Sequence, residues 1–196
     1  MEPVDRLVDS DDTVDVIAED VPGYEFYVWY GVTAPAKTSP GAGPVFVVET
    51  VKGTFEVETY PNEAPKTVEH ILALVKRNFY NGHRVHRQVP GFVAQFGDPL
   101  SRDVSKKHLW GTGGSMYAIG VNEASPLHTH ETGAVATAHP GDPRQADSQM
   151  YIMLAPRHNL DGDYTVFANI AYGKKGATEA EVVANGVGTP PPSDNR

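Results

Sequence analysis

Short β-prone segments, separated by glycine and proline, run through most of this chain and leave little room for long helices. The 196 residues include 19 glycines and 16 prolines. Residues 45–50 and 55–60 are predicted to pair as a hairpin, because Phe55, Val57 and Thr59 alternate with polar side chains, as in a half-buried strand. Strands in quick succession favour a closed or nearly closed antiparallel barrel. Further short strands are predicted at 133–138, 149–154 and 164–170.

One amphipathic helix is predicted directly after this hairpin. Asn62 is the candidate N-cap, and Pro65 suits the first turn, where its missing N–H costs no hydrogen bond. A second short helix is predicted at 177–184. The apolar face of the first helix is predicted from residues at helical spacing, which are Val68, Ile71, Leu72 and Val75.

Charge divides the chain into an arm and a body. Residues 1–25 hold nine acidic residues and one arginine, a net −8 of the chain's −9, so the remaining residues carry only −1. A nearly neutral body without a basic stripe argues against nucleic-acid binding. We divide the chain into an acidic N-terminal arm at 1–23, an aromatic segment and linker at 24–43, a main domain at 44–187 and a proline-rich tail at 188–196.

Composition also limits the compartment and the chemistry. No apolar run approaches the roughly 18 residues of a membrane span. The first residues lack the basic start and apolar stretch of a signal peptide, but a cleaved signal replaced by a methionine would look the same. We expect a soluble monomer, either cytoplasmic or exported with a signal peptide that this sequence lacks. The absence of cysteine excludes disulfides, thiolate metal ligands and a cysteine nucleophile.

Residues 85–98 carry the side chains of greatest chemical interest. Arg87, Phe92 and Gln95 lie in a strand-like pattern that Pro90-Gly91 interrupts. An aromatic surface can bind a small apolar ring, and a fixed guanidinium can donate hydrogen bonds to an amide beside that ring. The segment therefore predicts a binding site for a small ring attached to an amide.

This segment resembles the active-site segment of the cyclophilins, the peptidyl-prolyl isomerases. Other blocks resemble the same family and occur in the family's order. The resemblance implies a mainly β fold over 44–187, a closed antiparallel cyclophilin-like β-barrel capped by one or two α-helices. The other blocks are Ala64-Pro65-Lys66-Thr67, Phe79-Tyr80, Gly111-Thr112-Gly113-Gly114, Asp147-Ser148-Gln149-Met150-Tyr151-Ile152 and Leu160-Asp161-Gly162.

The resemblance also implies roles for individual residues. Arg87 is similar to the family's catalytic arginine, and Gln95 to the amide that positions the substrate carbonyl. No metal and no cofactor are implied. The positions that bind the proline or its peptide fall on Phe92, Val93, Ala138, Gln149, Tyr151, Leu160 and Tyr164.

Several positions depart from the family pattern. Val93 replaces a methionine, Tyr151 replaces a phenylalanine and Tyr164 replaces a pocket histidine. Asn159 stands where the family has a tryptophan that favours cyclosporin, so weak or no cyclosporin binding is expected. The C-terminal sequence is rich in proline where the family usually adds a last strand, so we expect that place in the barrel to be either empty or filled by residues 24–31.

The function that the resemblance implies is rotation of X–Pro bonds in peptides and in unfolded or folding proteins. Such an amide resists rotation by roughly 18–20 kcal/mol, because the nitrogen lone pair is delocalised into the carbonyl. A catalyst must favour the twisted amide over both planar forms, which needs neither a nucleophile nor a metal. Hydrogen bonding from Arg87 to the prolyl nitrogen would do so.

Two alternatives remain open. One is a cyclophilin-like module that binds proline-containing segments with little catalysis. The other is a metal-dependent barrel enzyme that uses His128, His130 and Glu131, although a solvated loop is expected there. The loop at 111–114 lacks the ending of a phosphate loop and is interpreted as a flexible rim beside the groove. His86 is interpreted as a structural histidine.

Overall fold

The computed structural model describes residues 32–33, 43–50 and 53–170. Within these ranges, residues 32–33 and 53–54 are described by their backbone alone. The acidic arm, nearly all of the aromatic segment and linker, the second predicted helix and the proline-rich tail therefore lie outside the described residues. So does the question whether residues 24–31 take the place of a missing strand.

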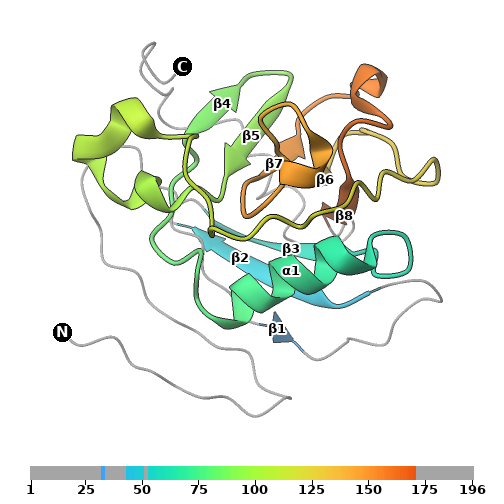
Figure 1. Cartoon of the computed structure of the whole chain (residues 1–196), viewed down its shortest axis with the longest axis horizontal. Coiled ribbons are helices and arrows are strands. Elements are labelled where there is room, and N and C mark those ends of the chain that lie inside the picture. Colours follow the sequence, from blue (N-terminus) through green and yellow to red (C-terminus); the bar gives the residue numbers. More distant parts are fainter. Residues whose placement is uncertain (1–31, 34–42, 51–52, 171–196) are drawn as a thin grey trace.

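One antiparallel sheet dominates the fold (Figure 1). Its strand order is β1-β2-β3-β8-β6-β7-β5-β4, so that the N-terminal strands lie at one end and the β4–β5 hairpin at the other. The strands are β1 (Val32–Thr33), β2 (Val45–Thr50), β3 (Gly53–Thr59), β4 (Arg87–Val89), β5 (Val93–Phe96), β6 (Ala134–Thr137), β7 (Met150–Met153) and β8 (Val166–Ile170).

The mainly β, antiparallel fold that the sequence predicted is confirmed. The sheet curls into a half-barrel, and among the described residues no ladder joins its end strands β1 and β4. The connections carry one α-helix and four short 3₁₀ helices. These are α1 (Pro65–Lys76), η1 (Pro99–Arg102), η2 (Val104–Leu109), η3 (Pro143–Gln145) and η4 (His158–Leu160).

The predicted first hairpin is present as β2 and β3. Phe46 and Val48 of β2 lie opposite Val57 and Phe55 of β3, and all four side chains are buried. The glutamates between them are only partly buried. The alternation in the sequence therefore specified which face of this hairpin enters the core.

Helix α1 begins as predicted, but its cap was predicted wrongly. The N-cap position is Ala64, without a side-chain hydrogen bond, and Asn62 is exposed. The carboxylate of Glu123, from a distant loop, instead accepts hydrogen bonds from the N–H groups of Lys66 and Thr67 at 3.1 and 2.8 Å. A local cap was unnecessary because this carboxylate satisfies free N–H groups at a helix end that favours negative charge.

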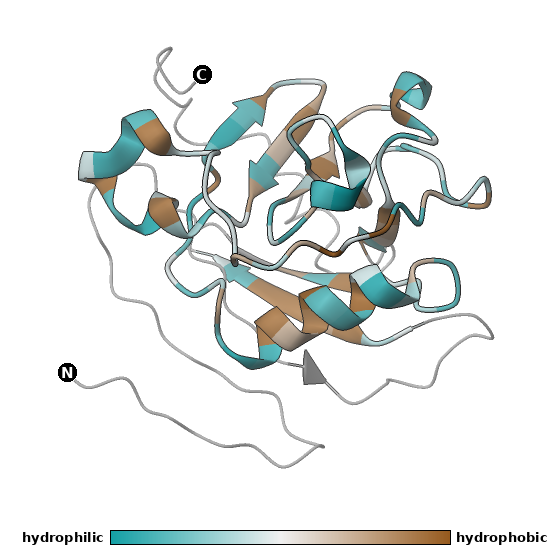
Figure 2. Ribbon diagram, in the orientation of Figure 1, coloured by the Kyte–Doolittle hydropathy of each residue, from teal (hydrophilic) through white to brown (hydrophobic). Residues whose placement is uncertain are grey.

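Helix α1 packs along β2 and β3, and hydrophobic residues recur on the helix and on these strands (Figure 2). Leu74 is fully buried, whereas Leu72, predicted for the apolar face, is only partly buried. The helix has 12 residues, and no helix among the described residues combines the length and hydropathy of a membrane span. The buried face consists of Thr67, Val68, Ile71, Leu74 and Val75.

The two faces of the sheet build two separate cores. Ile152 of β7 packs into the larger core beneath α1, while its neighbour Tyr151 belongs to a smaller cluster on the opposite face. This separation follows from the period-2 alternation of strand side chains. The smaller cluster consists of Val93, Ala134, Ala136, Tyr151, Met153 and Val166, with the partly buried Tyr60, Phe92, Ala138, Leu160 and Tyr164 against it.

Candidate active site

The β4–β5 hairpin brings Arg87 and Gln95 face to face. These residues are register partners, and Nη1 of Arg87 donates to Oε1 of Gln95 at 3.3 Å. Pro90-Gly91-Phe92 forms the turn, with Gly91 at a φ of 66°, a left-handed conformation that suits glycine. The turn closes with a hydrogen bond of 3.0 Å from the N–H of Phe92 to the carbonyl of Val89. The local sequence therefore fixes the register that pairs the cation with the amide.

Side-chain amides extend this pair across the sheet. Nε2 of Gln95 donates to Oε1 of Gln149 at 2.9 Å, and Nε2 of Gln149 donates to the carbonyls of Gly111 and Gly113 at 2.9 and 2.7 Å. Each amide is oriented by its neighbour, so Oε1 of Gln95 must face the guanidinium. Polar groups thus run without interruption from the loop at 111–113 to Arg87.

The rim at 111–114 is tied down, contrary to the prediction of a flexible loop. The buried carboxylate of Asp98 accepts hydrogen bonds from the N–H groups of Leu100, Gly111 and Gly113 at 2.7, 2.5 and 3.1 Å. A Cβ atom on Gly113 would lie 2.3 Å from Oδ1 of Asp98. Glycine is therefore needed here because a carboxylate packs directly against the backbone.

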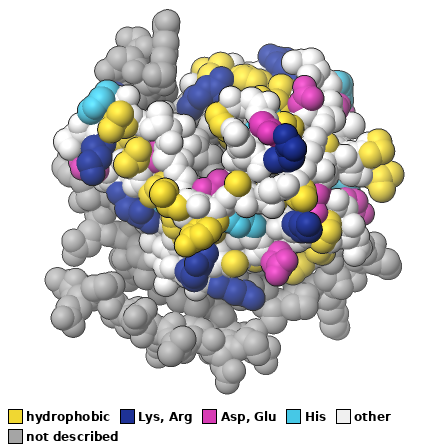
Figure 3. Space-filling model, viewed as in Figure 1, with side chains coloured by type: hydrophobic (Ala, Val, Ile, Leu, Met, Phe, Trp, Pro, Cys, Tyr) yellow, Lys and Arg dark blue, Asp and Glu magenta, His cyan; other side chains and the backbone are white. Residues whose placement is uncertain are grey.

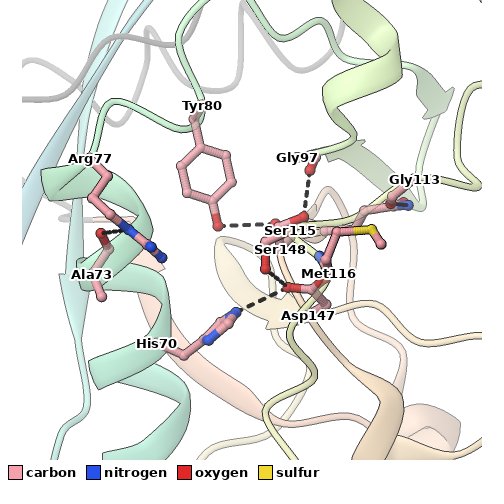
Figure 4. A network of polar contacts seen from close by, with 11 residues as sticks. His70, Ala73, Arg77, Tyr80, Gly97, Gly113, Ser115, Met116, Asp147 and Ser148 are labelled. Atoms are coloured by element: carbon pink, nitrogen blue, oxygen red, sulfur yellow. Dashed lines mark hydrogen bonds and ion pairs between the residues drawn. The ribbon is translucent and has the colours of Figure 1, made fainter.

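A second carboxylate, that of Asp147, joins the rim to α1 (Figure 4). Asp147 accepts from the hydroxyl of Ser115, from the N–H of Met116 at 3.1 Å and from Nε2 of His70 at 3.1 Å. Burial raises the pKa of Asp147, but the hydrogen bonds from His70 and Ser115 more than offset this effect, so its pKa is lowered. Sequence reasoning assigned no role to Asp98, Asp147 or His70. Of these three, only Asp98 has a signal in the sequence, because an aspartate directly before a proline is typical of the N-cap that it forms on η1.

The predicted proline-binding residues come together on the face opposite α1. Val93 and Tyr151 belong to the smaller core cluster, and Phe92, Ala138, Leu160 and Tyr164 pack against it. Tyr151 is the register partner of both Gln95 and Ala136, so it lies beside the polar row. The N–H of Ala138 donates to the carbonyl of Gln149 at 2.9 Å. An aromatic and aliphatic surface thus adjoins Arg87 and Gln95.

Tyr151 is anchored from behind by a buried histidine. Its hydroxyl lies 3.0 Å from Nε2 of His130, whose Nδ1 lies 2.6 Å from Oδ1 of Asp161. A carboxylate only accepts, so Nδ1 donates to Asp161, and Nε2 shares a hydrogen bond with the hydroxyl of Tyr151. Burial, together with the charges of Tyr164 and Asp161, raises the pKa of Tyr151 well above its usual value. Sequence reasoning missed this contact.

The loop predicted to be solvated at 128–131 is therefore partly internal, and that prediction was wrong for His130, whose side chain is fully buried. The candidate metal ligands also have separate partners. His128 stacks on Tyr60 at a centroid distance of 3.7 Å, and Glu131 pairs with His158 at 3.4 Å. Within the part of the chain that is described, no group of three or more potential ligands could hold a metal ion.

His86 occupies the buried side of the hairpin, directly before Arg87. It is 7% exposed, and burial, the largest effect, lowers its pKa to about 4. Its ring packs beside Gly111 of the rim. A histidine that is uncharged at neutral pH fits the predicted structural role rather than that of an acid.

Two guanidinium groups approach the ring of Phe92. The Cζ atoms of Arg87 and Arg157 lie 5.5 and 5.7 Å from the ring centroid, within the range of cation–π contact. Nη2 of Arg157 also donates to the carbonyl of Gly91 at 3.1 Å. Nothing in the sequence spacing indicated Arg157, because 66 residues separate it from Gly91.

On the face seen in Figure 3, lysines and arginines are scattered among acidic and neutral residues rather than aligned in a stripe. This view agrees with the near-neutral charge of the body and offers no track for a phosphate backbone.

Comparison with known proteins gives consistent matches. The family model described as cyclophilin type peptidyl-prolyl cis-trans isomerase/CLD matches residues 45–193. Peptidyl-prolyl cis-trans isomerase B of Bacillus subtilis is 40% identical over 118 residues, which cover 60% of this chain and 76% of that protein. A peptidyl-prolyl cis-trans isomerase of Helicobacter pylori (strain J99) is 34% identical over 123 residues, covering 63% of this chain and 70% of that protein.

Solved structures agree with these matches. A cyclophilin type peptidyl-prolyl cis-trans isomerase of Cryptosporidium parvum has a TM-score of 0.62 and 25% identity, covering 72% of this chain and 83% of that one. Its structure in the presence of the dipeptide Ala-Pro has a TM-score of 0.59 and 24% identity, covering 70% and 84%. The second likeness bears on the fold alone.

Proposed function

This chain belongs to the cyclophilin-type peptidyl-prolyl cis-trans isomerase family, and on that premise we propose that Arg87, Gln95 and the surface around Phe92 rotate X–Pro bonds. The observation that carries the proposal is the contact of 3.3 Å between Nη1 of Arg87 and Oε1 of Gln95, next to an aromatic ring. The guanidinium of Arg87, the amide of Gln95 and the ring of Phe92 are therefore close enough together to contact one proline residue.

The proline ring binds on the apolar surface. Phe92 forms its floor, Val93 and Tyr151 lie in the cluster below, and Leu160 and Tyr164 pack at its margin. A buried proline ring gains apolar contact whether its amide is cis or trans. Ring binding therefore holds the substrate without by itself favouring one isomer.

The side of the bond that precedes the proline is held by polar groups. Nε2 of Gln95, which has one N–H left, donates to the carbonyl of the preceding residue, and Gln149 orients that amide. The N–H of Ala138 already donates to Gln149, so its carbonyl is the group that pairs with the peptide. With one side of the bond held and the ring bound, rotation about the amide is the motion that remains.

Arg87 stabilises the twisted state. Twisting interrupts the delocalisation of the nitrogen lone pair, which then accepts a hydrogen bond from the guanidinium. The planar substrate offers no such lone pair, so this interaction forms only near the top of the barrier and lowers it. Each 1.36 kcal/mol gained there accelerates the reaction about tenfold. The step needs no nucleophile and no proton transfer.

The substrates are proline-containing peptides, including X–Pro bonds in unfolded or folding proteins. An Ala-Pro peptide is the simplest member of this class and the first substrate to test. Asn159, an exposed residue of η4, stands at the position of the family's tryptophan, so cyclosporin should bind weakly or not at all.

A second candidate is a module that binds proline segments with little turnover. It is favoured by the tyrosines at 151 and 164, because the hydroxyl of Tyr151 is fixed by His130 and could restrict the movement of a rotating substrate. Exchange spectroscopy by NMR on an Ala-Pro peptide separates the two. Saturable binding without faster exchange would select the module.

The same assay tests the catalytic role directly. Wild type should accelerate exchange, and Arg87→Ala should lose most of that acceleration. Arg77, an exposed residue at the end of α1 whose Nε donates to Ala73, offers a matched control. Equal turnover of wild type and Arg87→Ala would refute the proposed mechanism.

A further inference from the structure

A continuous row of contacts runs along one side of the proposed site and ends at a residue with no role in the mechanism above. Gln149 lies 2.9 Å from Gln95, Gln95 lies 3.3 Å from Arg87, and the guanidinium of Arg87 lies 5.5 Å from the ring of Phe92. The guanidinium of Arg157 lies 5.7 Å from the centroid of the same ring. The row therefore has polar amides at one end and a second cation at the other.

Arg157 is held in place at that end. Its Nη2 donates to the carbonyl of Gly91 in the hairpin turn, and its Nη1 donates to the carbonyl of Pro156. The residue is nevertheless exposed, so its remaining N–H groups face solvent. A guanidinium that is already oriented loses little conformational freedom when it binds a ligand.

The positive charge of Arg157 is not neutralised by an ion pair within the described residues, and neither is that of Arg87. Two acidic residues lie near Arg157, Asp161 four residues further along the chain and Glu131 next to His130, whose carbonyl accepts from the N–H of Arg157, and both have other partners. Asp161 binds His130 and His158, and Glu131 binds His158. Two cations without an ion pair therefore lie within cation–π distance of the ring of Phe92, which favours an anion near the bound proline.

The direction of the peptide follows from the proposed function, on which this inference rests. The residue before the proline is held at Gln95 and Gln149, so the residues after the proline leave across Phe92 toward Arg157. We propose that Arg157 is a specificity residue that binds a carboxylate on the C-terminal side of the proline. That carboxylate belongs either to an acidic side chain or to the end of the peptide itself.

An exposed ion pair of this kind is worth about a two- to fivefold change in affinity and weakens with added salt. The effect belongs in KM, since the carboxylate is bound equally well before and during rotation. This distinguishes Arg157 from Arg87, whose loss should lower kcat.

The test compares peptides that differ only after the proline. NMR exchange would give kcat and KM of the full chain for N-acetylated Ala-Ala-Pro-Glu, Ala-Ala-Pro-Gln and Ala-Ala-Pro-Lys amides. It would also compare Ala-Ala-Pro-Ala with a free and with an amidated C-terminus. The last pair separates a chain-end carboxylate from an acidic side chain.

Wild type should show a two- to fivefold lower KM for at least one carboxylate-bearing peptide than for its neutral partner. This difference in KM should become smaller at high salt. In Arg157→Gln that ratio should fall to about one. Arg157→Lys should retain part of it, and Arg77→Gln should retain all of it. Acidic and neutral peptides with equal KM in wild type, or an unchanged ratio in Arg157→Gln, would overturn the proposal.

These outcomes are separate from those that test the isomerase itself. If wild type fails to accelerate exchange of the neutral glutamine peptide, the proposed function fails. If it accelerates that exchange but has the same KM for carboxylate-bearing and neutral peptides, only the proposed role of Arg157 fails.

Discussion

The hydroxyl of Tyr151 lies 3.0 Å from Nε2 of His130, so a residue of the proposed proline-binding surface is fixed by a histidine that is fully buried. Asp161 holds the other side of that imidazole. The position of the Tyr151 ring thus depends on a polar contact as well as on packing.

Tyr151→Phe should therefore destabilise the protein. The substitution leaves Nε2 of His130 buried without its partner, which costs about 1–3 kcal/mol of unfolding free energy. Urea unfolding measures this loss. Tyr117→Phe, at a residue that is 68% exposed, is the control and should be neutral. A phenylalanine variant as stable as wild type would mean that the hydrogen bond contributes nothing.

Buried histidines should make the protein less stable in mild acid. The pKa of His86 is about 4 in the folded state and about 6.5 in an unfolded chain. Between these values the unfolded state binds the proton more readily, so the unfolding free energy should fall as pH falls from about 6.5 to 4. His83, whose pKa burial lowers to about 2, acts in the same direction further into acid.

Urea unfolding between pH 4 and 7 measures this effect. His86→Gln should weaken the dependence on pH, whereas His108→Gln, at an exposed position, should not. NMR of the His86 ring provides a second check, because the ring should still be uncharged at pH 5. A charged His86 at that pH would contradict the account.

Asp147 should contribute stability that is present above the unfolded pKa of aspartate, about 3.9, and lost as pH falls through its lower folded value. Asp147→Asn should therefore be destabilising near neutral pH, and the difference from wild type should shrink in strong acid. Glu69→Gln, at an exposed position on the same helix as His70, is the control. A difference that stays constant from pH 7 to 2 would argue against the role of this carboxylate.

Gly113→Ala should impair the rim. The new methyl group would lie 2.3 Å from Oδ1 of Asp98, so the carboxylate or the loop must move. Because Gln149 donates to the carbonyl of Gly113, its amide loses orientation and KM for Ala-Pro peptides should rise. Steady-state kinetics checks this prediction, and an alanine variant with unchanged KM would show that the rim tolerates the shift.

Contacts formed within a short stretch of chain could be predicted from the sequence. Arg87 and Gln95 are eight residues apart on one hairpin, so their pairing follows from a turn that proline and glycine specify. The alternation of Phe55 and Val57 likewise identified a buried face. Resemblance to the family then indicated which residues are proposed to bind the proline ring.

Contacts between distant parts of the chain could not be predicted. The cap of α1 comes from Glu123, 57 residues beyond Lys66, and His70 meets Asp147 across 77 residues. His130 looked like a loop residue because its neighbours are polar, yet Asp161 and Tyr151 surround it in the fold. Such partners are set by the topology of the sheet, which local patterns do not encode.

The catalytic role of Arg87 is the central claim, and the exchange rate of an Ala-Pro peptide tests it most directly. NMR exchange should be measured for wild type, Arg87→Ala, Arg87→Lys and the control Arg77→Ala under the same conditions. We predict that Arg87→Ala lowers kcat/KM about 10²- to 10³-fold, as expected for loss of one preorganised donor, while Arg77→Ala matches wild type. Arg87→Lys should fall between them, because a lysine keeps the charge but not the rigid fork. Equal kcat/KM for wild type and Arg87→Ala would contradict the account.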